Sequence, residues 1–404
     1  MKVAQINSSC GFGSTGKIAV EISKKLDEKS VENRIFYSGN KVSCEKNGVL
    51  INRKTDIRIH QILSRLFGDQ GWHSYFTTKK LVRRLKEFSP DIIHLHNLHG
   101  YYLHMGVLFS YLAKSNARVI WTLHDCWAFS GHCTHFTSVN CNKWQKECFC
   151  CPQKKAYPYS WFFDRSKTLF NRKQKLYSAV CDMQITAVSN WLSGVAANSK
   201  LLSGRKITVI PNGIDTKVFA PAAPLTEIGG IDISNKKVIL GVANSWSKSK
   251  GLDDFVALSK EIPDGYVIVL VGLRPEQAAG LPSNIISLQH TDSIESLVKL
   301  YSTALVYFNA SVEETFGLTT IEALSCGTPA ITYNATACAE PVTADTGFVL
   351  SPHDIKGVKE AILTVDKKGK DFYKNACQKH VLESYDANKI YKRYIDLYFR
   401  EQEG

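Results

Sequence analysis

Two glutamates eight residues apart, Glu314 and Glu322, are the side chains of this sequence best placed to do chemistry. Glu314 follows the apolar run ALVYFNA, which is typical of a buried strand, and Glu322 lies in TTIEALSCG, which is typical of a short helix. We expect Thr319 or Thr320 to cap this helix and Glu322 to lie in its first turn. With a second strand over 330–333, the segment is one strand-helix-strand step of a parallel sheet.

This strand-to-helix corner has the groups that a nucleotide with a hydroxylated substituent requires. In open α/β sheets, ligands bind at the carboxyl ends of the strands. The first turn of a helix exposes unpaired N–H groups and a partial positive charge, which suit a phosphate. A carboxylate can accept two hydrogen bonds from the diol of a ribose or a sugar. The alternative is that Glu322 only balances the helix dipole and that Glu314 is a solvated loop residue.

The stretch ETFGLTTIEALSCGTPAIT resembles the E-x7-E signature of retaining glycosyltransferases of family GT4, and the match runs without a gap through the Gly-Thr-Pro turn. The resemblance implies an α/β structure of the GT-B type, with two Rossmann-like domains facing across a cleft. It implies that Glu314 acts in catalysis and that Glu322 binds the ribose. The other nucleotide-sugar contacts that it implies in this segment are Phe316, Gly317, Leu318 and Thr319.

A glycine-rich motif, GFGSTGK, starts at Gly11, between a strand-like segment that ends at Asn7 and an amphipathic helix predicted over 18–26. G-x-G-x-x-G in this position lets backbone N–H groups approach a phosphate. The spacing also mimics a P-loop, but Ile18 occupies the position where that motif has its Mg²⁺-binding hydroxyl. GT4 enzymes resemble this sequence in having a glycine-rich loop after the first strand, so Gly13 is expected near the donor phosphates.

A histidine follows the strand predicted over 118–123, in the tetrapeptide Thr-Leu-His-Asp. A histidine at this edge of a sheet, with Asp125 beside it to orient it, is suited to acid-base chemistry or sugar binding. The segment resembles the one whose histidine contacts the donor sugar in GT4 enzymes, so His124 is assigned to catalysis. His96 and His99 are alternatives, and a purely structural, hydrogen-bonded histidine is another.

The dipeptide Lys250-Gly251 resembles the family's K-G motif, whose lysine contacts the donor diphosphate. The arginine expected shortly before it is absent, because residues 244–246 read Asn-Ser-Trp. Lys248 is the candidate substitute, although a lysine cannot reproduce the two-pronged hydrogen bonding of a guanidinium. The sequence has no D-x-D motif, which argues against a metal clamp on the diphosphate. No cofactor is therefore expected for catalysis.

Six cysteines lie within residues 126–152, a segment that resembles the insert of some capsule and exopolysaccharide transferases of the colanic acid type. Four of them have spacings that end in the C-x2-C of a zinc knuckle, namely Cys133, Cys141, Cys148 and Cys151. The segment has little core-forming sequence, so a structural zinc ion is a candidate cofactor. An iron-sulfur cluster and free or redox-active thiols are the alternatives, and His132, His135 and Cys150 are possible substitute ligands.

A chain of 404 residues is long enough for two domains. We predict an acceptor-binding domain over 1–211 that contains the insert, a nucleotide-sugar-binding domain over 212–384, and a terminal helix over 385–404 that crosses back to the first domain. Residues 1–210 carry 31 Lys and Arg against 13 Asp and Glu, a net charge of +18, whereas 211–404 carry a net charge of −5. Such a basic domain attracts an anionic membrane surface.

These observations predict a retaining, nucleotide-sugar-dependent hexosyltransferase of cell-surface polysaccharide biosynthesis. Its expected partners are a nucleotide-diphosphate sugar and a lipid-linked saccharide acceptor. No apolar run is long enough for a membrane span and no signal peptide is evident, so a cytoplasmic protein, peripheral at the inner face of the membrane, is expected. The alternatives are a GT-B phosphorylase, epimerase or nucleotide-sugar hydrolase, and a basic zinc-containing nucleic-acid-binding protein. No nucleic acid is expected, because basic platforms with interleaved aromatics are lacking outside 157–163.

Overall fold

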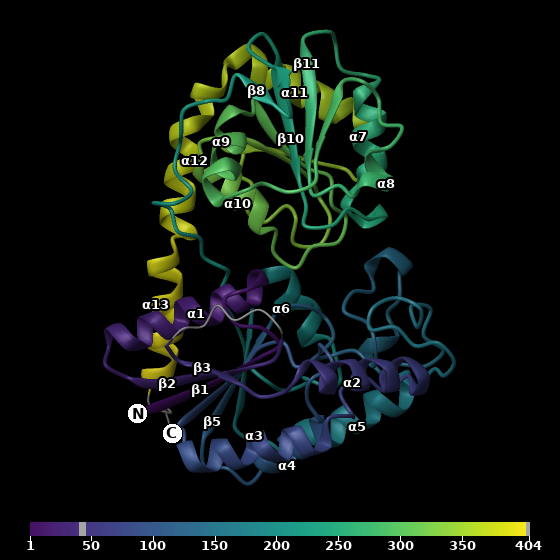
Figure 1. Cartoon of the computed structure of the whole chain (residues 1–404), viewed down its shortest axis with the longest axis vertical. Coiled ribbons are helices and arrows are strands. Elements are labelled where there is room, and N and C mark those ends of the chain that lie inside the picture. Colours follow the sequence, from purple (N-terminus) through teal and green to yellow (C-terminus); the bar gives the residue numbers. More distant parts are fainter. Residues whose placement is uncertain (40–45, 401–404) are drawn as a thin grey trace. The chain divides into compact units, whose positions relative to one another are not determined.

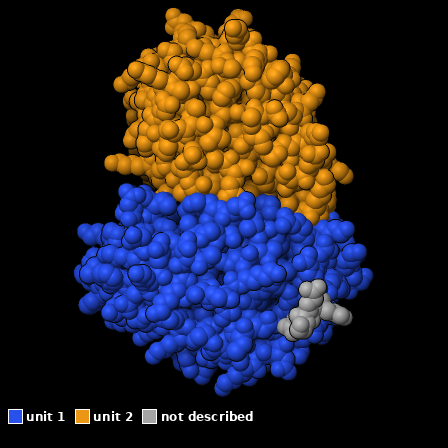
Figure 2. All heavy atoms as spheres, turned by 180° about the vertical axis from the view of Figure 1, so that it is seen from behind, with its two compact units in different colours: residues 1–211, 391–404 blue, residues 212–390 orange. Residues whose placement is uncertain are grey.

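The computed structural model describes residues 1–39 and 46–400 of the chain (Figure 1). The chain forms two compact units, which are coloured separately in Figure 2. Unit 1 comprises Met1–Pro211 with Tyr391–Gly404, and unit 2 comprises Asn212–Ile390.

Unit 1 contains a seven-stranded sheet in the order β3-β2-β1-β4-β5-β6-β7, in which every strand pair is parallel. The strands are β1 Lys2–Asn7, β2 Glu32–Tyr37, β3 Gly48–Leu50, β4 Ile92–Leu95, β5 Arg118–Leu123, β6 Met183–Ala187 and β7 Ile207–Val209. The helices are α1 Gly13–Glu28, α2 Lys54–Phe67, α3 Tyr75–Phe88, α4 Met105–Leu112, α5 Ser166–Ser178 and α6 Asn190–Ala197. Figure 1 shows α1 on one side of the sheet and α3 and α4 on the other. The central strands are therefore buried on both faces, which explains their nearly continuous apolar runs.

Unit 2 contains a six-stranded, all-parallel sheet in the order β12-β11-β10-β13-β14-β15. The strands are β10 Lys237–Val242, β11 Tyr266–Val271, β12 Ile285–Leu288, β13 Val306–Asn309, β14 Ala330–Tyr333 and β15 Gly347–Leu350, and a separate hairpin joins β8 Glu227–Ile228 to β9 Ile231–Asp232. The helices are α7 Leu252–Ser259, α8 Pro275–Ala278, α9 Ile294–Thr303, α10 Leu318–Ser325, α11 Ile355–Lys368 and α12 Lys370–Ser384. Its core includes a contiguous aromatic group in which the Phe308 ring packs against Phe255 at 4.9 Å and against Tyr333 at 5.6 Å.

The last helix, α13 Ala387–Phe399, carries the chain from unit 2 into unit 1. The Tyr398 hydroxyl lies 2.6 Å from Nδ1 of His94 in β4, and Arg118 of β5 donates to the carbonyl oxygens of Leu397 and Arg400. Residues from the end of the chain thus complete the packing of the first sheet. In the described part of the chain, no helix is both long and apolar enough to cross a membrane.

The strands and helices predicted above are present in the structure, and the differences concern where they begin and end. The helix predicted over 18–26 begins five residues earlier, at Gly13, so the glycine-rich motif includes the first turn of α1. In the insert, the only regular elements are two single 3₁₀ turns, η1 Thr137–Val139 and η2 Lys143–Gln145.

Candidate active site

The corner between β13 and α10 in unit 2 has the predicted order of strand, acidic loop and helix, but a different cap. Gly317, with φ of +89°, precedes the helix and takes the capping position expected of a threonine. Thr319 accepts a hydrogen bond from the Tyr307 hydroxyl at 2.7 Å, and Thr320 accepts one from the side-chain amide of Asn309 at 3.1 Å. Both threonines therefore tie α10 to β13. The expectation that one of them caps the helix was wrong.

Glu322 lies in the second turn of α10, not in the first, because the helix begins at Leu318. The hydroxyl of Tyr301, which comes from α9, donates a hydrogen bond to Oε2 of Glu322 at 2.9 Å. Burial raises the pKa of Tyr301 far above its ordinary value, and the Glu322 carboxylate raises it further. The tyrosine is therefore a permanent donor that orients a half-buried carboxylate.

Glu314 forms an ion pair with Lys250, the lysine of the K-G dipeptide. Its carboxylate also accepts a hydrogen bond from the Ser311 hydroxyl at 3.2 Å, and its backbone N–H donates to Thr336 Oγ1 at 2.9 Å. Two loops that lie 64 residues apart in the sequence thus place a cation and a carboxylate in contact. Ser311 and Thr336 hold Glu314 in this position, and nothing in the sequence indicated this role.

Gly251 allows the Lys250 loop to approach the Glu314 loop. Its φ is +74°, and a Cβ atom at this position would stand 2.4 Å from the carbonyl oxygen of Ala310. A neighbouring backbone hydrogen bond, from Val312 N–H to Ser249 O at 2.9 Å, joins the same two loops. Only glycine combines this dihedral with this contact. The second residue of the K-G pair therefore positions the first.

The two glutamates act on a common neighbour, Tyr307. Burial raises the pKa of this tyrosine, and the carboxylates of Glu314 and Glu322 both raise it further. Glu314 also adds to the effect of burial on Cys338, whose pKa is raised to about 12. Both carboxylates of the E-x7-E pair thus lie near Tyr307, in β13.

Near the position of the missing arginine, Trp246 is buried and Lys248 is exposed. The Trp246 indole is buried, its N–H donates to Val271 O at 2.9 Å, and its ring packs against Phe255. Lys248 is exposed on a 3₁₀ turn, η3 Lys248–Lys250, which also carries Lys250. Phe316 is buried with its ring against Tyr385 at 5.7 Å, so its side chain supports the corner and its backbone is what a ligand could reach.

Gly13 and His124 belong to unit 1, where they lie at the carboxyl ends of β1 and β5. The glycine-rich loop is closed by a hydrogen bond from Gly11 N–H to Gly16 O at 3.0 Å. The position of a Cβ atom on Gly13 would be in open space. The start of α1 is therefore accessible to a ligand.

His124 is buried and stacks on His96, with 3.1 Å between Nε2 of His124 and Nδ1 of His96. Burial lowers the pKa of His124 to about 4, so the imidazole is neutral at pH 7. The expectation that Asp125 orients His124 through a hydrogen bond was wrong. Asp125 instead contacts Nε2 of His99 at 2.6 Å and accepts from the Trp127 N–H at 2.8 Å.

The three candidate histidines nevertheless share one small pocket, which His96, His99, His124 and Asp125 line together. The sequence left open which of them contacts a sugar, and the structure shows that they are neighbours. Burial alone would raise the pKa of Asp125, but the adjacent His99 outweighs it and lowers the value. The pocket thus combines the neutral imidazole of His124 with the Asp125 carboxylate, which contacts His99.

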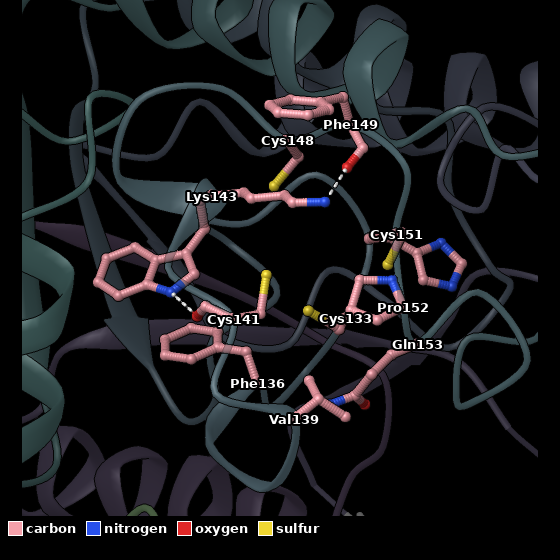
Figure 3. Close-up of a pocket in the computed structure, with 12 residues that line it drawn as sticks. Cys133, Phe136, Val139, Cys141, Lys143, Cys148, Phe149, Cys151, Pro152 and Gln153 are labelled. Atoms are coloured by element: carbon pink, nitrogen blue, oxygen red, sulfur yellow. Dashed lines mark hydrogen bonds between the residues drawn. The ribbon is translucent and has the colours of Figure 1, made fainter.

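The four cysteines assigned to a metal, Cys133, Cys141, Cys148 and Cys151, line one pocket in the insert (Figure 3). All four are free thiols. In the part of the chain that the structure describes, no three His, Cys, Asp or Glu side chains already stand at metal-binding positions. Cys150 is exposed and is not part of the pocket wall.

The chain has two α/β units, each built on a sheet of parallel strands, and the second has an acidic strand-to-helix corner. This is the architecture of GT-B glycosyltransferases. A glycosyltransferase from Rickettsia africae ESF-5 superimposes with a TM-score of 0.70 at 16% identity, over 98% of this chain and 97% of that one. Anabaena HepE, in a complex with UDP and glucose, also has a TM-score of 0.70 at 16% identity, over 98% of this chain and 99% of the other.

The chain belongs to glycosyltransferase family 4. The model of Glycosyltransferase Family 4 matches residues 15–218, and that of Glycosyl transferases group 1 matches residues 227–379. A putative colanic acid biosynthesis glycosyl transferase, WcaC of Escherichia coli K12, is 23% identical over 88% of each chain. The capsular polysaccharide biosynthesis glycosyltransferase CapM of Staphylococcus aureus is 24% identical over 55% of this chain and 64% of its own. The family resemblance seen in the E-x7-E segment is thereby confirmed, and the protein is a glycosyltransferase.

Proposed function

We propose that this glycosyltransferase moves a sugar from a nucleotide-diphosphate sugar to a saccharide acceptor in cell-surface polysaccharide biosynthesis, with retention of configuration. The observation that carries the proposal is the Lys250–Glu314 pair beside Glu322, at the carboxyl end of β13. Relatives named for colanic acid, capsule and O-antigen synthesis support the pathway class, and the UDP and glucose in the HepE complex support the donor class.

In this proposal the corner of unit 2 binds the nucleotide part of the donor. Glu322, oriented by Tyr301, accepts the ribose hydroxyls. Lys250 contacts the diphosphate, together with backbone N–H groups at the start of α10. The ion pair between Lys250 and Glu314 therefore has to loosen when the donor binds, since the phosphate competes for the ammonium group. Glu314 is then released toward the donor sugar.

The transfer itself needs no cofactor in this proposal. The leaving phosphate takes the proton of the acceptor hydroxyl, and the new glycosidic bond forms on the face from which the nucleotide departs. Glu314 holds the sugar by hydrogen bonds, and neutral His124 adds one without bringing a charge. The cation of Lys250 offsets the negative charge that grows on the diphosphate.

A lipid-linked acceptor is part of the proposal because unit 1 exposes aromatic and basic side chains together. Trp161 N–H donates to Arg65 O at 2.7 Å, which joins the loop over 159–163 to the end of α2. The exposed apolar side chains here are Ile59, Ile62, Phe67, Tyr159, Trp161, Phe162 and Phe163. The Arg65 guanidinium lies 5.5 Å from the Tyr159 ring and 5.8 Å from that of Trp161. We call this surface the aromatic patch, and its composition suits the interface of an anionic bilayer.

The donor is identified by a thermal-shift screen of nucleotide diphosphates and nucleotide sugars, because a bound ligand stabilises the folded state by mass action. A stabilising nucleotide sugar is then incubated with and without a lipid-linked oligosaccharide. We expect a glycosylated lipid only when both are present. Release of free sugar at an equal rate without acceptor would show a hydrolase, and would refute the proposed transfer.

Membrane binding is tested by flotation with vesicles of phosphatidylcholine alone or with phosphatidylglycerol. We expect flotation with the anionic vesicles, a decrease on adding salt, and its loss in the Trp161→Ser, Phe162→Ser variant. Phe372→Ser is the matched control, because Phe372 is equally exposed but belongs to unit 2. Equal binding by the double variant and the control would exclude the aromatic patch as the contact.

A further inference from the structure

The insert of unit 1 has little regular secondary structure. Apart from η1 and η2 its backbone is irregular, and its apolar core is a small aromatic group in which Phe136 stacks on Trp144 at 4.4 Å. Irregular segments of this length are uncommon in compact domains unless an additional constraint orders them. The cysteines of the insert could supply that constraint.

Four thiols from separate turns of this segment converge. Figure 3 shows the sulfur atoms of Cys133, Cys141, Cys148 and Cys151 directed into one pocket. Cys133 and Cys148 are only 7% and 8% exposed. Cys150, which is adjacent to Cys151, is exposed to solvent instead. Of the two adjacent cysteines, Cys151 therefore lines the pocket and Cys150 does not.

A backbone N–H group already points at one of these sulfur atoms. Gly131 N–H donates to Cys148 Sγ at 3.2 Å. A Cβ atom on Gly131 would stand 2.6 Å from Cys148 Cβ, so this approach requires glycine. Donors of this kind orient the ligands of metal sites and stabilise their negative charge.

Two lysines supply positive charge next to the pocket. Lys143 lies in its wall and donates to the carbonyl oxygens of Phe149 and Cys150, both at 3.2 Å. Lys173 is buried, and its ammonium group donates to Ser130 O at 3.0 Å, next to the Gly131 turn. Four thiolates and one divalent ion carry two negative charges. The two ammonium groups offset them, which also gives the buried Lys173 a counter-charge.

We propose that Cys133, Cys141, Cys148 and Cys151 bind one zinc ion as thiolates and release their four protons to solvent. A set of four thiolates selects soft metals with tetrahedral geometry, of which zinc is the structural one. Zinc binding requires the four sulfurs to move to ligating distance, because in the described part of the chain they do not already stand at metal-binding positions. His132 also lines the pocket, and its buried Nε2 has no hydrogen-bond partner in the structure. The experiment must therefore determine whether His132 replaces one of the four cysteines as a zinc ligand.

Metal analysis of the purified full-length protein tests the site. We expect about one zinc per chain, and its loss in Cys148→Ser and in Cys151→Ser. Cys150→Ser is the matched control and should retain zinc, because Cys150 is next to a ligand but exposed. A metal-free wild-type protein, or equal loss of zinc from Cys150→Ser and Cys151→Ser, would overturn the proposal.

A second measurement uses the wild-type protein and does not depend on the folding of cysteine variants. Titration with an organomercurial, with a chromogenic zinc chelator present, should release the zinc in step with the blocking of four thiols. Replacement of zinc by Co²⁺ should produce the spectrum of a tetrahedral all-thiolate site, unchanged in His132→Ala. A changed spectrum in that variant, or iron-sulfur absorption in the isolated protein, would refute the all-cysteine zinc site.

Discussion

The hydrogen bond from Tyr301 to Glu322 allows the role of the second glutamate to be tested without removing its charge. Tyr301→Phe deletes one hydroxyl from a fully buried side chain and leaves the carboxylate in place. We expect the nucleotide to bind more weakly, because Glu322 is no longer held in the orientation that accepts the ribose. The variant should remain folded, since the ring and its packing against Tyr307 at 5.7 Å are kept.

The size of the effect follows from the geometry of this bond. A hydrogen bond to a charged group contributes about 1.5–3 kcal/mol when its partner has no substitute. Glu322 is only half-buried, so water can take over part of the interaction, and the lower end of that range applies. A loss of about 1.5 kcal/mol corresponds to a roughly ten-fold increase in the Kd of the nucleotide.

Isothermal titration with the nucleotide diphosphate found in the screen measures this change. Tyr307→Phe is the matched control, because its hydroxyl is as buried but donates to Thr319 rather than to a carboxylate. We expect Tyr301→Phe to raise the Kd and Tyr307→Phe to leave it nearly unchanged. A Kd that rises only in Tyr307→Phe, or equally in both variants, would refute the assignment of Glu322 to the ribose.

Three further predictions concern the same units. Glu314→Ala should lower kcat while leaving the donor Kd unchanged or smaller, because Lys250 is freed for the diphosphate; initial rates and titration separate the two effects. Gly251→Ala should lower Tm by several degrees more than Gly280→Ala, since both glycines have positive φ but only Gly251 is crowded, by Ala310; calorimetry measures this. Burial lowers the pKa of His94 from 6.5 to about 3, so its contribution to stability is complete above pH 6.5 and is lost as the pH falls toward 3. Urea unfolding at pH 7 and pH 5 should show this decrease, and equal stability at both would contradict it.

The corner in unit 2 was predictable because its signals are local. A short apolar run, an acidic loop and a helix ending in Gly-Thr-Pro follow one another, and β14 occupies the range predicted for it, Ala330–Tyr333. The capping position was missed because a threonine and a glycine in the αL conformation can both precede a helix. In the structure the hydroxyls of Thr319 and Thr320 have other partners, Tyr307 and Asn309, in β13.

Pairings between distant residues were not predictable from local patterns. Asp125 was assigned to the adjacent His124, but in the structure it contacts His99, which lies 26 residues away. The partner of Lys250 was likewise not predicted, because Glu314 was assigned to catalysis and Lys250 to the donor diphosphate. Such pairings depend on which strands are neighbours in the sheet, and the spacing of residues along the chain does not predict the strand order.

The return of α13 to the first sheet has a consequence for how the protein is made. The hydrogen bond between His94 and Tyr398 joins residues 304 positions apart, so β4 emerges from the ribosome long before its partner exists. Domains usually fold as units while synthesis continues, and here β4 cannot make this hydrogen bond until α13 has been synthesised. Until then the surface that Tyr394 and Tyr398 later cover is open to water, to chaperones and to other nascent chains.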